Sequence, residues 1–208
     1  MEKVICCPHE YYGSQFSKFI DSEARSSKHS WIYDIIAAGA ASKHEQVYIE
    51  REQWCLVLDK HHGQDTRYLI VFRDTSLRTI RDLSVEHVTL LQNIYETVSK
   101  WLRCRSDKKY YFYFNYMPSV FQLHLHVNSN TQHINREHAH FLNVVCANLG
   151  KDSQYYTKVF MLTKLCPTIH RANVHTKLAF KLPDTKFVNS LPGNHVTGNA
   201  VGNAVFML

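Results

Sequence analysis

Hydrophobic and polar residues alternate strictly in one short stretch near the middle of the chain, residues 122–128. The apolar positions are Leu123, Leu125 and Val127, and the polar positions are Gln122, His124, His126 and Asn128. Because side chains alternate between the two faces of a β-strand, this pattern predicts a strand with one face in the core. The opposite face then carries two imidazoles about 7 Å apart.

The remaining pattern predicts an α+β fold. Strands are expected over residues 47–50, 53–58, 68–73 and 109–116, with further strands over 159–163 and 178–182. A helix is expected from Ser30, either continuing through Ala41 or stopping at Gly39. A longer helix should begin at Ser84, and its apolar residues recur at threes and fours: Val88, Leu91, Ile94, Tyr95, Val98 and Leu102. Asn135 is expected to cap another helix, with a buried stripe of Phe141, Leu142, Val145 and Leu149.

The chain divides into three parts by composition. Residues 1–29 give weak signals and are interpreted as an N-terminal arm or partial helix. Residues 30–165 form one domain, which 208 residues with 45% hydrophobic content can support. Residues 166–208 form a C-terminal extension whose tail contains a short Gly-Asn repeat, interpreted as flexible or edge-pairing.

Composition narrows the class of protein. The net charge of +6 favours an anionic partner such as a phosphate-bearing ligand, but the charge is too evenly spread to require nucleic acid. The six cysteines have no paired zinc spacing, and we expect free thiols. No apolar run reaches the roughly 18 residues of a membrane span. We therefore expect a soluble intracellular protein, cytoplasmic or nuclear, with no membrane partner.

The two imidazoles form a compact cluster of hydrogen-bond donors and nucleophiles. A neutral imidazole is a good nucleophile, and a covalent intermediate divides one difficult displacement into two easier ones. Its second ring nitrogen should then donate to a backbone carbonyl or a similar acceptor. A solvated amphipathic edge strand and a metal-binding pair are the alternatives, because a chain with fourteen histidines brings some together by chance.

Several motifs around this strand resemble the histidine-triad superfamily and, within it, the scavenger mRNA decapping enzymes. The segments that carry the likeness are Trp31-Ile32-Tyr33, Arg81 to His87, Leu90 to Ile94, Tyr116-Met117-Pro118-Ser119, His138 to Leu142 and Asn148-Leu149. They span roughly residues 30–162. The resemblance implies a histidine-triad-like fold, in which a long helix packs across an antiparallel sheet, usually in a homodimer.

The resemblance also implies an activity. The family hydrolyses a phosphoanhydride through a covalent nucleotidyl-histidine, and His124 falls on the nucleophile and His126 on the third histidine of the triad. The expected substrate is a capped dinucleotide, a short capped RNA or another nucleotide. The scheme needs no metal or other cofactor.

Substrate contacts follow from the same resemblance. Asp59 and Lys60 stand where the family contacts substrate, although a surface loop pair is the alternative for both. Ser119 and Gln122 are expected to donate to phosphate oxygens, unless the Ser119 hydroxyl only bonds its own turn. Trp31 is the candidate for stacking on a cationic methylated guanine, and helix packing is its alternative.

Two histidines of the family pattern are replaced. Gln122 stands at the first triad position, and Asn115 stands where a histidine contacts phosphate; both are kept as substrate-binding candidates. Val120 replaces a tyrosine, and either Lys43 or Glu45 falls where a glutamate reads the guanine edge. The changes leave the nucleophile in place but reduce the substrate contacts.

Three other functions stay open. The chain could hydrolyse another nucleotide, such as a dinucleoside polyphosphate, a nucleoside phosphoramidate or an adenylylated adduct. It could instead be a catalytically weakened module that binds caps or nucleotides, because histidines are replaced. An unrelated RNA-binding role is the weakest alternative, since no basic stripe is interleaved with the aromatic residues.

Overall fold

The computed structural model describes residues 3–6, 21, 29–41, 46–59, 67–116, 118–136, 138–159 and 161–164. Some sequence predictions therefore lie outside the described residues. These are the substrate contact at Lys60, the edge-reading position at Lys43 or Glu45, the strand over 178–182 and the repeat-containing extension from 166 onward.

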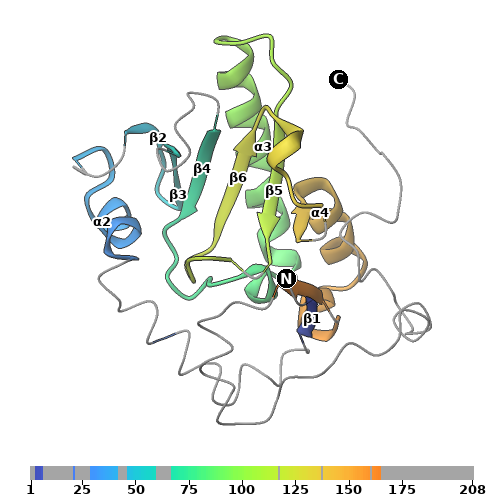
Figure 1. The fold of residues 1–208 in the computed structure, drawn as a ribbon. Coiled ribbons are helices and arrows are strands. Elements are labelled where there is room, and N and C mark those ends of the chain that lie inside the picture. The colour runs from blue at the N-terminus through green and yellow to red at the C-terminus, as the bar shows by residue number, and fades with distance from the viewer. Residues whose placement is uncertain are drawn as a thin grey trace.

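Six antiparallel strands form the main sheet, in the order β2-β3-β4-β6-β5-β7 (Figure 1). Their bounds are β2 Val47–Glu50, β3 Trp54–Leu58, β4 Arg67–Phe72, β5 Tyr111–Asn115, β6 His124–Asn128 and β7 Ala139–Phe141. The strand that carries the histidine pair, β6, is paired on both sides, by β4 and β5. The predicted α+β class and antiparallel sheet are confirmed, and the histidines lie in the interior of the sheet and not on its edge.

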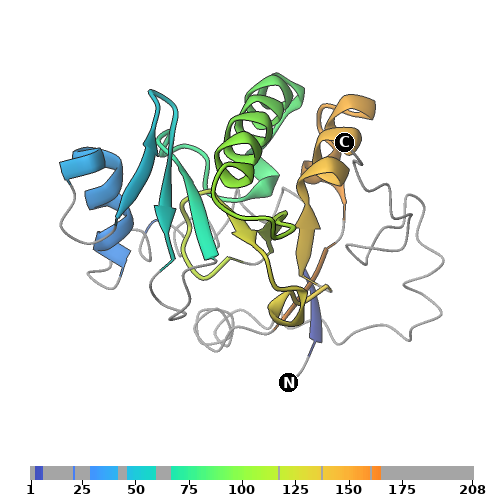
Figure 2. The same ribbon diagram turned by 90° about the horizontal axis from the view of Figure 1, so that it is seen from above.

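Four α-helices accompany the sheet in the described part of the chain: α2 Ser30–Ala38, α3 Val88–Arg103, α4 Leu142–Lys151 and α5 Tyr155–Lys158. Short 3₁₀ turns span Gly39–Ala41, Ile80–Asp82, Val85–His87 and Thr131–His133. Ser84 precedes the predicted long helix as expected, but the first turn is 3₁₀ and α3 itself begins at Val88. Figure 2 shows α3 and α4 on the same side of the sheet.

The main core lies between the sheet and these two helices. Leu123, Leu125 and Val127 point into it, as the alternation in residues 122–128 predicts. From α3 the core receives the predicted stripe: Leu91, Ile94, Val98 and Leu102 are buried, and Val88 and Tyr95 pack against them. Removing this apolar surface from water is the dominant stabilising contribution to the fold.

The opposite face of the sheet is covered at one end by α2. Ile32 and Ile35 of this helix are buried against a second apolar cluster that includes Leu69 and Val71 of β4. The helix ends at Gly39, the earlier of the two predicted ends, with a positive φ of 53° that glycine adopts without steric penalty. A Cβ atom at residue 39 would also collide with the Glu50 carboxylate.

An ion pair fixes the end of α2 to the sheet. Glu50 at the end of β2 pairs with Arg73 just after β4, with Nη2 and Oε1 2.5 Å apart. Arg73 also donates to the Ile36 carbonyl at 3.2 Å, and Glu50 accepts from the Ala40 N–H at 3.1 Å. These contacts hold α2, and therefore Trp31 in its first turn, in a defined position beside β4.

The helix predicted from Asn135 begins later, so that prediction is wrong in its boundary. Residues 139–141 form β7 and pair with β5, and α4 begins at Leu142. The Asn135 carbonyl instead accepts the N–H groups of His138 and Ala139, which closes a turn leading into the strand. Pairing with β5 satisfies backbone groups over three residues that carry no recognisable strand pattern of their own.

The N-terminal arm contributes a strand, where the sequence suggested only an arm or a partial helix. Residues Lys3–Cys6 form β1, which pairs antiparallel with β8, Met161–Lys164, in a separate two-stranded sheet. The predicted strand over 159–163 is therefore present with slightly shifted bounds. Among the described residues, no helix is long and apolar enough to cross a membrane.

Candidate functional site

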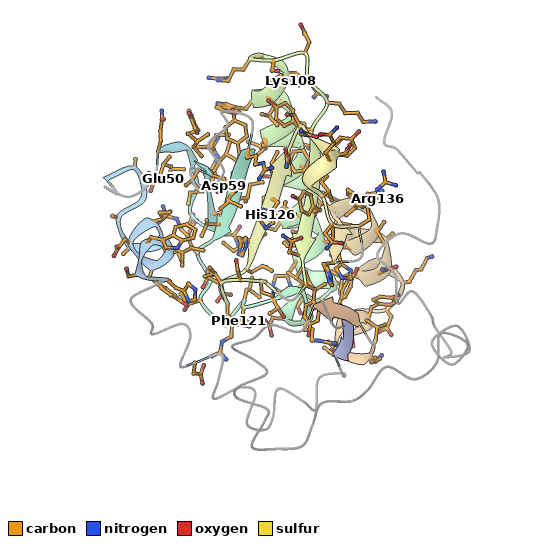
Figure 3. All side chains as sticks on the ribbon, in the orientation of Figure 1. Glu50, Asp59, Lys108, Phe121, His126 and Arg136 are labelled. Atoms are coloured by element: carbon orange, nitrogen blue, oxygen red, sulfur yellow. The ribbon has the colours of Figure 1, made fainter. Side chains whose placement is uncertain are left out.

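The register of the sheet defines one face that carries the candidate chemistry. In β6 the two imidazoles project away from the α3 side, because they alternate with the core residues. His124 lies opposite Val71 of β4, and His126 lies between Leu69 of β4 and Tyr113 of β5. We call this surface, the side of the sheet opposite α3, the histidine face. Figure 3 shows His126 at the centre of the sheet, with Asp59 beyond β4.

His124 is held in one tautomer by its own strand. Its Nδ1 atom lies 2.7 Å from the backbone carbonyl oxygen of Gln122, which can only accept, so Nδ1 carries the proton and Nε2 carries the lone pair. The side chain is only 8% exposed. The expectation that the second ring nitrogen donates to a backbone carbonyl is confirmed.

The protonation state of His124 follows from its burial. Removal from water is the main cause that lowers the pKa of His124 below its ordinary value of 6.5. The hydrogen bond to the Gln122 carbonyl and the negative charge of Asp59 act in the opposite direction. Burial prevails, and the imidazole is uncharged at neutral pH.

His126 is packed between aromatic rings. It stacks on Tyr113 with ring centroids 5.1 Å apart and an interplanar angle of 12°, and it meets the His124 ring edge-on at 5.1 Å. Its Nε2 atom lies 3.0 Å from the Asn115 side-chain nitrogen. With the amide in this orientation the nitrogen donates, and the His126 proton lies on Nδ1. Asn115 therefore contacts His126 directly.

Gln122 has a different set of contacts from the one predicted for substrate binding. The side chain is 0% exposed, and its amide nitrogen donates to the Phe72 carbonyl at 2.8 Å and the Asp74 carbonyl at 3.0 Å. Both amide hydrogens are used, so a contact with phosphate would require one of these bonds to break. As placed, Gln122 ties the start of β6 to the end of β4 and thereby fixes the carbonyl that holds His124.

Several polar side chains extend the histidine face beyond His126. The Tyr113 hydroxyl hydrogen-bonds the Asn128 side chain, and burial is the main cause that raises the pKa of Tyr113. Both Arg67 and Asp59 act on the same hydroxyl through their charges. Asp59 is 6% exposed, and its N–H donates to the Arg67 carbonyl at 3.0 Å. Of the predicted Asp59–Lys60 pair, Asp59 thus lies on the histidine face.

Trp31 and Ser119 lie near the same face. Trp31 is half-buried against the cluster that contains Val71 and Val120, and Val71 is the strand partner of His124. Ser119 is exposed, in the connection between β5 and β6. The structure therefore gathers Trp31, Asp59, Asn115, Gln122, His124 and His126 around β6, with Ser119 in the adjacent loop. Whether each contacts substrate stays a prediction.

Sequence reasoning missed Tyr113, Asn128 and Arg67. Asn128 belongs to the polar set of the central strand, so the alternation contained a signal for it. Tyr113 and Arg67 lie on the histidine face because of how β5 and β4 are aligned with β6. The pattern of residues within each strand does not determine that alignment.

A second buried polar cluster lies on the α3 side of the sheet. Arg81 is 1% exposed; its guanidinium donates to the Tyr116 hydroxyl at 2.7 Å and to the Tyr156 and Val159 carbonyls at 2.7 and 3.1 Å. His140 lies beside it, and burial together with the Arg81 charge lowers the pKa of His140 to about 4. This cluster joins four segments of the chain, on the side of the sheet opposite the histidine face. Among the described residues, no group of three or more His, Cys, Asp or Glu side chains is arranged to hold a metal ion.

Comparison with known proteins connects this geometry to one family. A family model described as scavenger mRNA decapping enzyme C-term binding matches residues 30–148. A human protein named m7GpppX diphosphatase is 29% identical over 149 residues, which cover 64% of this chain and 43% of that protein. Its namesakes from Bos taurus and Rattus norvegicus are 27% and 28% identical over 151 residues, covering 65% of this chain and 44% of each relative. The matched region is thus less than half the length of these relatives.

Proposed function

The chain belongs to the scavenger mRNA decapping enzyme C-terminal family, and on that premise we propose that it hydrolyses the phosphoanhydride bridge of short m7G-capped RNA remnants. The observation that carries the proposal is the environment of His124: Nδ1 donates to the Gln122 carbonyl, and burial keeps the ring neutral. The Nε2 lone pair is then available as a nucleophile without a separate base.

The reaction would proceed in two displacements. The Nε2 lone pair of His124 bonds to the phosphorus that carries methylguanosine, and the bridging P–O bond breaks with its electron pair on the departing diphosphate end of the RNA. A water oxygen then bonds to the same phosphorus as the P–N bond breaks. The electron pair returns to Nε2, a water proton passes to the medium, and m7GMP is released.

Asp59 would stabilise the intermediate. Nucleotidyl transfer to Nε2 places a positive charge on the His124 ring, because Nδ1 keeps its proton. The Asp59 charge raises the pKa of His124, which means that it favours the cationic ring over the neutral ring. The same attraction would favour the cationic nucleotidyl-histidine.

The other residues would orient the substrate. His126, which lies beside His124, and Ser119 would donate to non-bridging phosphate oxygens, as Lys60 would if it is brought to the site. Each such donor is typically worth on the order of 3 kcal/mol of barrier. Trp31 would stack on the methylated guanine, whose positive charge is attracted to the indole face.

The test is incubation of micromolar enzyme with m7GpppG, with chromatographic detection of m7GMP. We expect product from the wild type and none from His124→Asn, and mass spectrometry should find a methylguanylyl adduct on the peptide containing His124. Absence of product from the folded wild-type chain would refute the proposal. Equal rates on methylated and unmethylated caps would favour hydrolysis of another nucleotide.

A cap-binding or nucleotide-binding module without turnover is the second candidate. The observation that favours it is the replacement of two family histidines by Gln122 and Asn115, which engage backbone carbonyls and His126. Titration of m7GpppG into wild type and His124→Asn separates the two functions. Equal affinity with no product from either protein would support the binding module.

A further inference from the structure

Four aromatic rings from separate segments meet at one end of the sheet. Trp101 near the end of α3 lies 5.2 Å from Tyr48 of β2 and 5.5 Å from Tyr68 of β4, measured between ring centroids. Tyr48 and Tyr68 are 5.7 Å apart, and Tyr110, just before β5, lies 6.2 Å from Tyr68. Tyr48 is 37% exposed. We call this group the aromatic rim.

Cationic side chains accompany the aromatic rim. The Arg105 guanidinium lies 4.2 Å from the Trp101 ring centroid and also donates to the Trp101 carbonyl at 3.2 Å. Residues 100–109 contain five cationic and one anionic side chains, a local charge of +4 in a chain whose net charge is +6. In the described structure Arg103, Arg105, Lys108 and Lys109 are all exposed. A local concentration of positive charge therefore lies beside Trp101 and the exposed Tyr48 ring.

The cationic segment, and not the rings of the aromatic rim, reaches the histidine face. Lys109 lies 5.5 Å from the ring centroid of Tyr111, at the start of β5. Tyr111 is the register partner of Asn128, two residues beyond His126 on the same face of β6. Figure 3 labels Lys108 in the loop beyond the end of the strands, with His126 at the centre of the sheet. The cationic segment thus lies at the end of the sheet where Tyr111 and Asn128 are paired, which is also one end of the histidine face.

We propose that the aromatic rim and the 100–109 segment bind the single-stranded RNA that follows the cap. This inference rests on the proposed function for its physiological substrate. Phosphates of the RNA would be attracted by Arg103, Lys108 and Lys109. Bases would stack on the exposed Tyr48 ring and on the outer face of the Arg105 guanidinium, a mode that tolerates any sequence.

Core packing alone accounts for only part of this arrangement. Tyr68, Trp101 and Tyr110 pack against the main core, so their inner faces close the end of the sheet. That role does not require an exposed tyrosine beside them or an arginine stacked on the outer face of the indole. An exposed aromatic ring next to cationic side chains is a feature of single-stranded RNA sites.

The experiment measures binding of a fluorescein-labelled, uncapped, ten-nucleotide single-stranded RNA by anisotropy at several salt concentrations. Lys108→Glu and Lys109→Glu are each compared with Lys151→Glu, an exposed lysine at the end of α4 that makes the same charge change elsewhere. Tyr48→Ala tests stacking. Hydrolysis of m7GpppG, which has no RNA body, is measured for every variant.

We expect wild type to bind RNA at 50 mM salt, with an affinity that falls as salt increases. Each charge reversal in the 100–109 segment should weaken binding about fivefold or more and reduce the salt slope by about 0.7. Tyr48→Ala should weaken binding about tenfold while leaving the salt slope unchanged. Lys151→Glu should stay within about twofold of wild type, and no variant should alter m7GpppG turnover.

The inference fails if wild type binds no RNA at 50 mM salt, or if Lys151→Glu loses as much affinity as Lys108→Glu. Equal binding of a double-stranded RNA of the same length would contradict stacking. Equal binding of a polyglutamate peptide would assign the surface to an acidic protein partner. Failure of the proposed function would appear separately, as absent m7GpppG turnover, and would leave the RNA-binding result intact.

Discussion

His140 should make the protein less stable in mild acid. Its folded-state pKa is about 4, held below the ordinary value of 6.5 by burial and by the Arg81 charge. Because the folded-state pKa is lowered, the stabilising contribution is complete above pH 6.5 and is lost as the pH falls toward 4. For a group with these two values, the free energy of unfolding should fall by about 2 kcal/mol between pH 7 and pH 5.

The perturbation that isolates this contribution is His140→Phe. A phenyl ring can keep the edge-on contacts with Tyr116 and Tyr156, whose centroids lie 6.4 and 6.0 Å from the imidazole, but it cannot take up a proton. Urea unfolding followed by tryptophan fluorescence at pH 7, 6 and 5 gives the free energy of unfolding for each protein. The wild-type curve should fall more steeply than the variant curve, by about 2 kcal/mol over this range.

The same measurement bears on catalysis, because activity can be lost in acid for two reasons: the protein unfolds, or His124 becomes protonated. His124 also has a lowered pKa, so activity carried by its neutral form should persist below pH 6.5 until the ring is protonated. If His140→Phe extends folding but not activity to lower pH, protonation of His124 sets the limit. A variant that keeps the full wild-type pH dependence of unfolding would refute the role assigned to His140.

Three further substitutions test the structure around β6. Gln122→Leu removes two buried hydrogen bonds and should lower the free energy of unfolding, measured by urea denaturation, by about 2 kcal/mol. The same substitution should reduce kcat more than it raises KM, because the Gln122 carbonyl that holds His124 loses its support. Asn115→Asp places a carboxylate beside His126 Nε2 and should raise the pKa of that ring in an NMR titration; an unchanged pKa would contradict the contact. Gly39→Ala should lower Tm, with a loss of about 1 kcal/mol or more, because alanine at positive φ is strained and its methyl group meets the Glu50 carboxylate, which accepts the Ala40 N–H. An unchanged Tm would argue against this geometry.

Much of the fold could be predicted from local patterns. The alternation in residues 122–128 gave β6 with the correct buried face, and the spacing of threes and fours gave α3 and its stripe. Asn135 was a misleading signal, because a good capping residue can also close a turn through its backbone carbonyl. The three-residue strand β7 that follows exists because β5 offers it a pairing edge, and a pattern within residues 139–141 cannot reveal that edge.

The candidate site was predicted less completely than the fold. The tautomer of His124 could be expected from imidazole chemistry, since its hydrogen bond is made to the carbonyl only two residues earlier. The contacts of Gln122 and Asn115 could not, because they depend on where β4 and β5 lie beside β6. The aromatic rim was missed for the same reason: its rings come from four separate segments of the chain.

The amino-acid sequence by itself determined the strand periodicity, the amphipathic helix and the histidine pair, because each depends on residues close together in the chain. It also determined the resemblance to one family, through short motifs that lie between residues 30 and 162. Only the tertiary structure decided the pKa of His124, the partners of His126 and the gathering of rings and cations at one end of the sheet. Burial, strand register and charge proximity are properties of chain segments packed together.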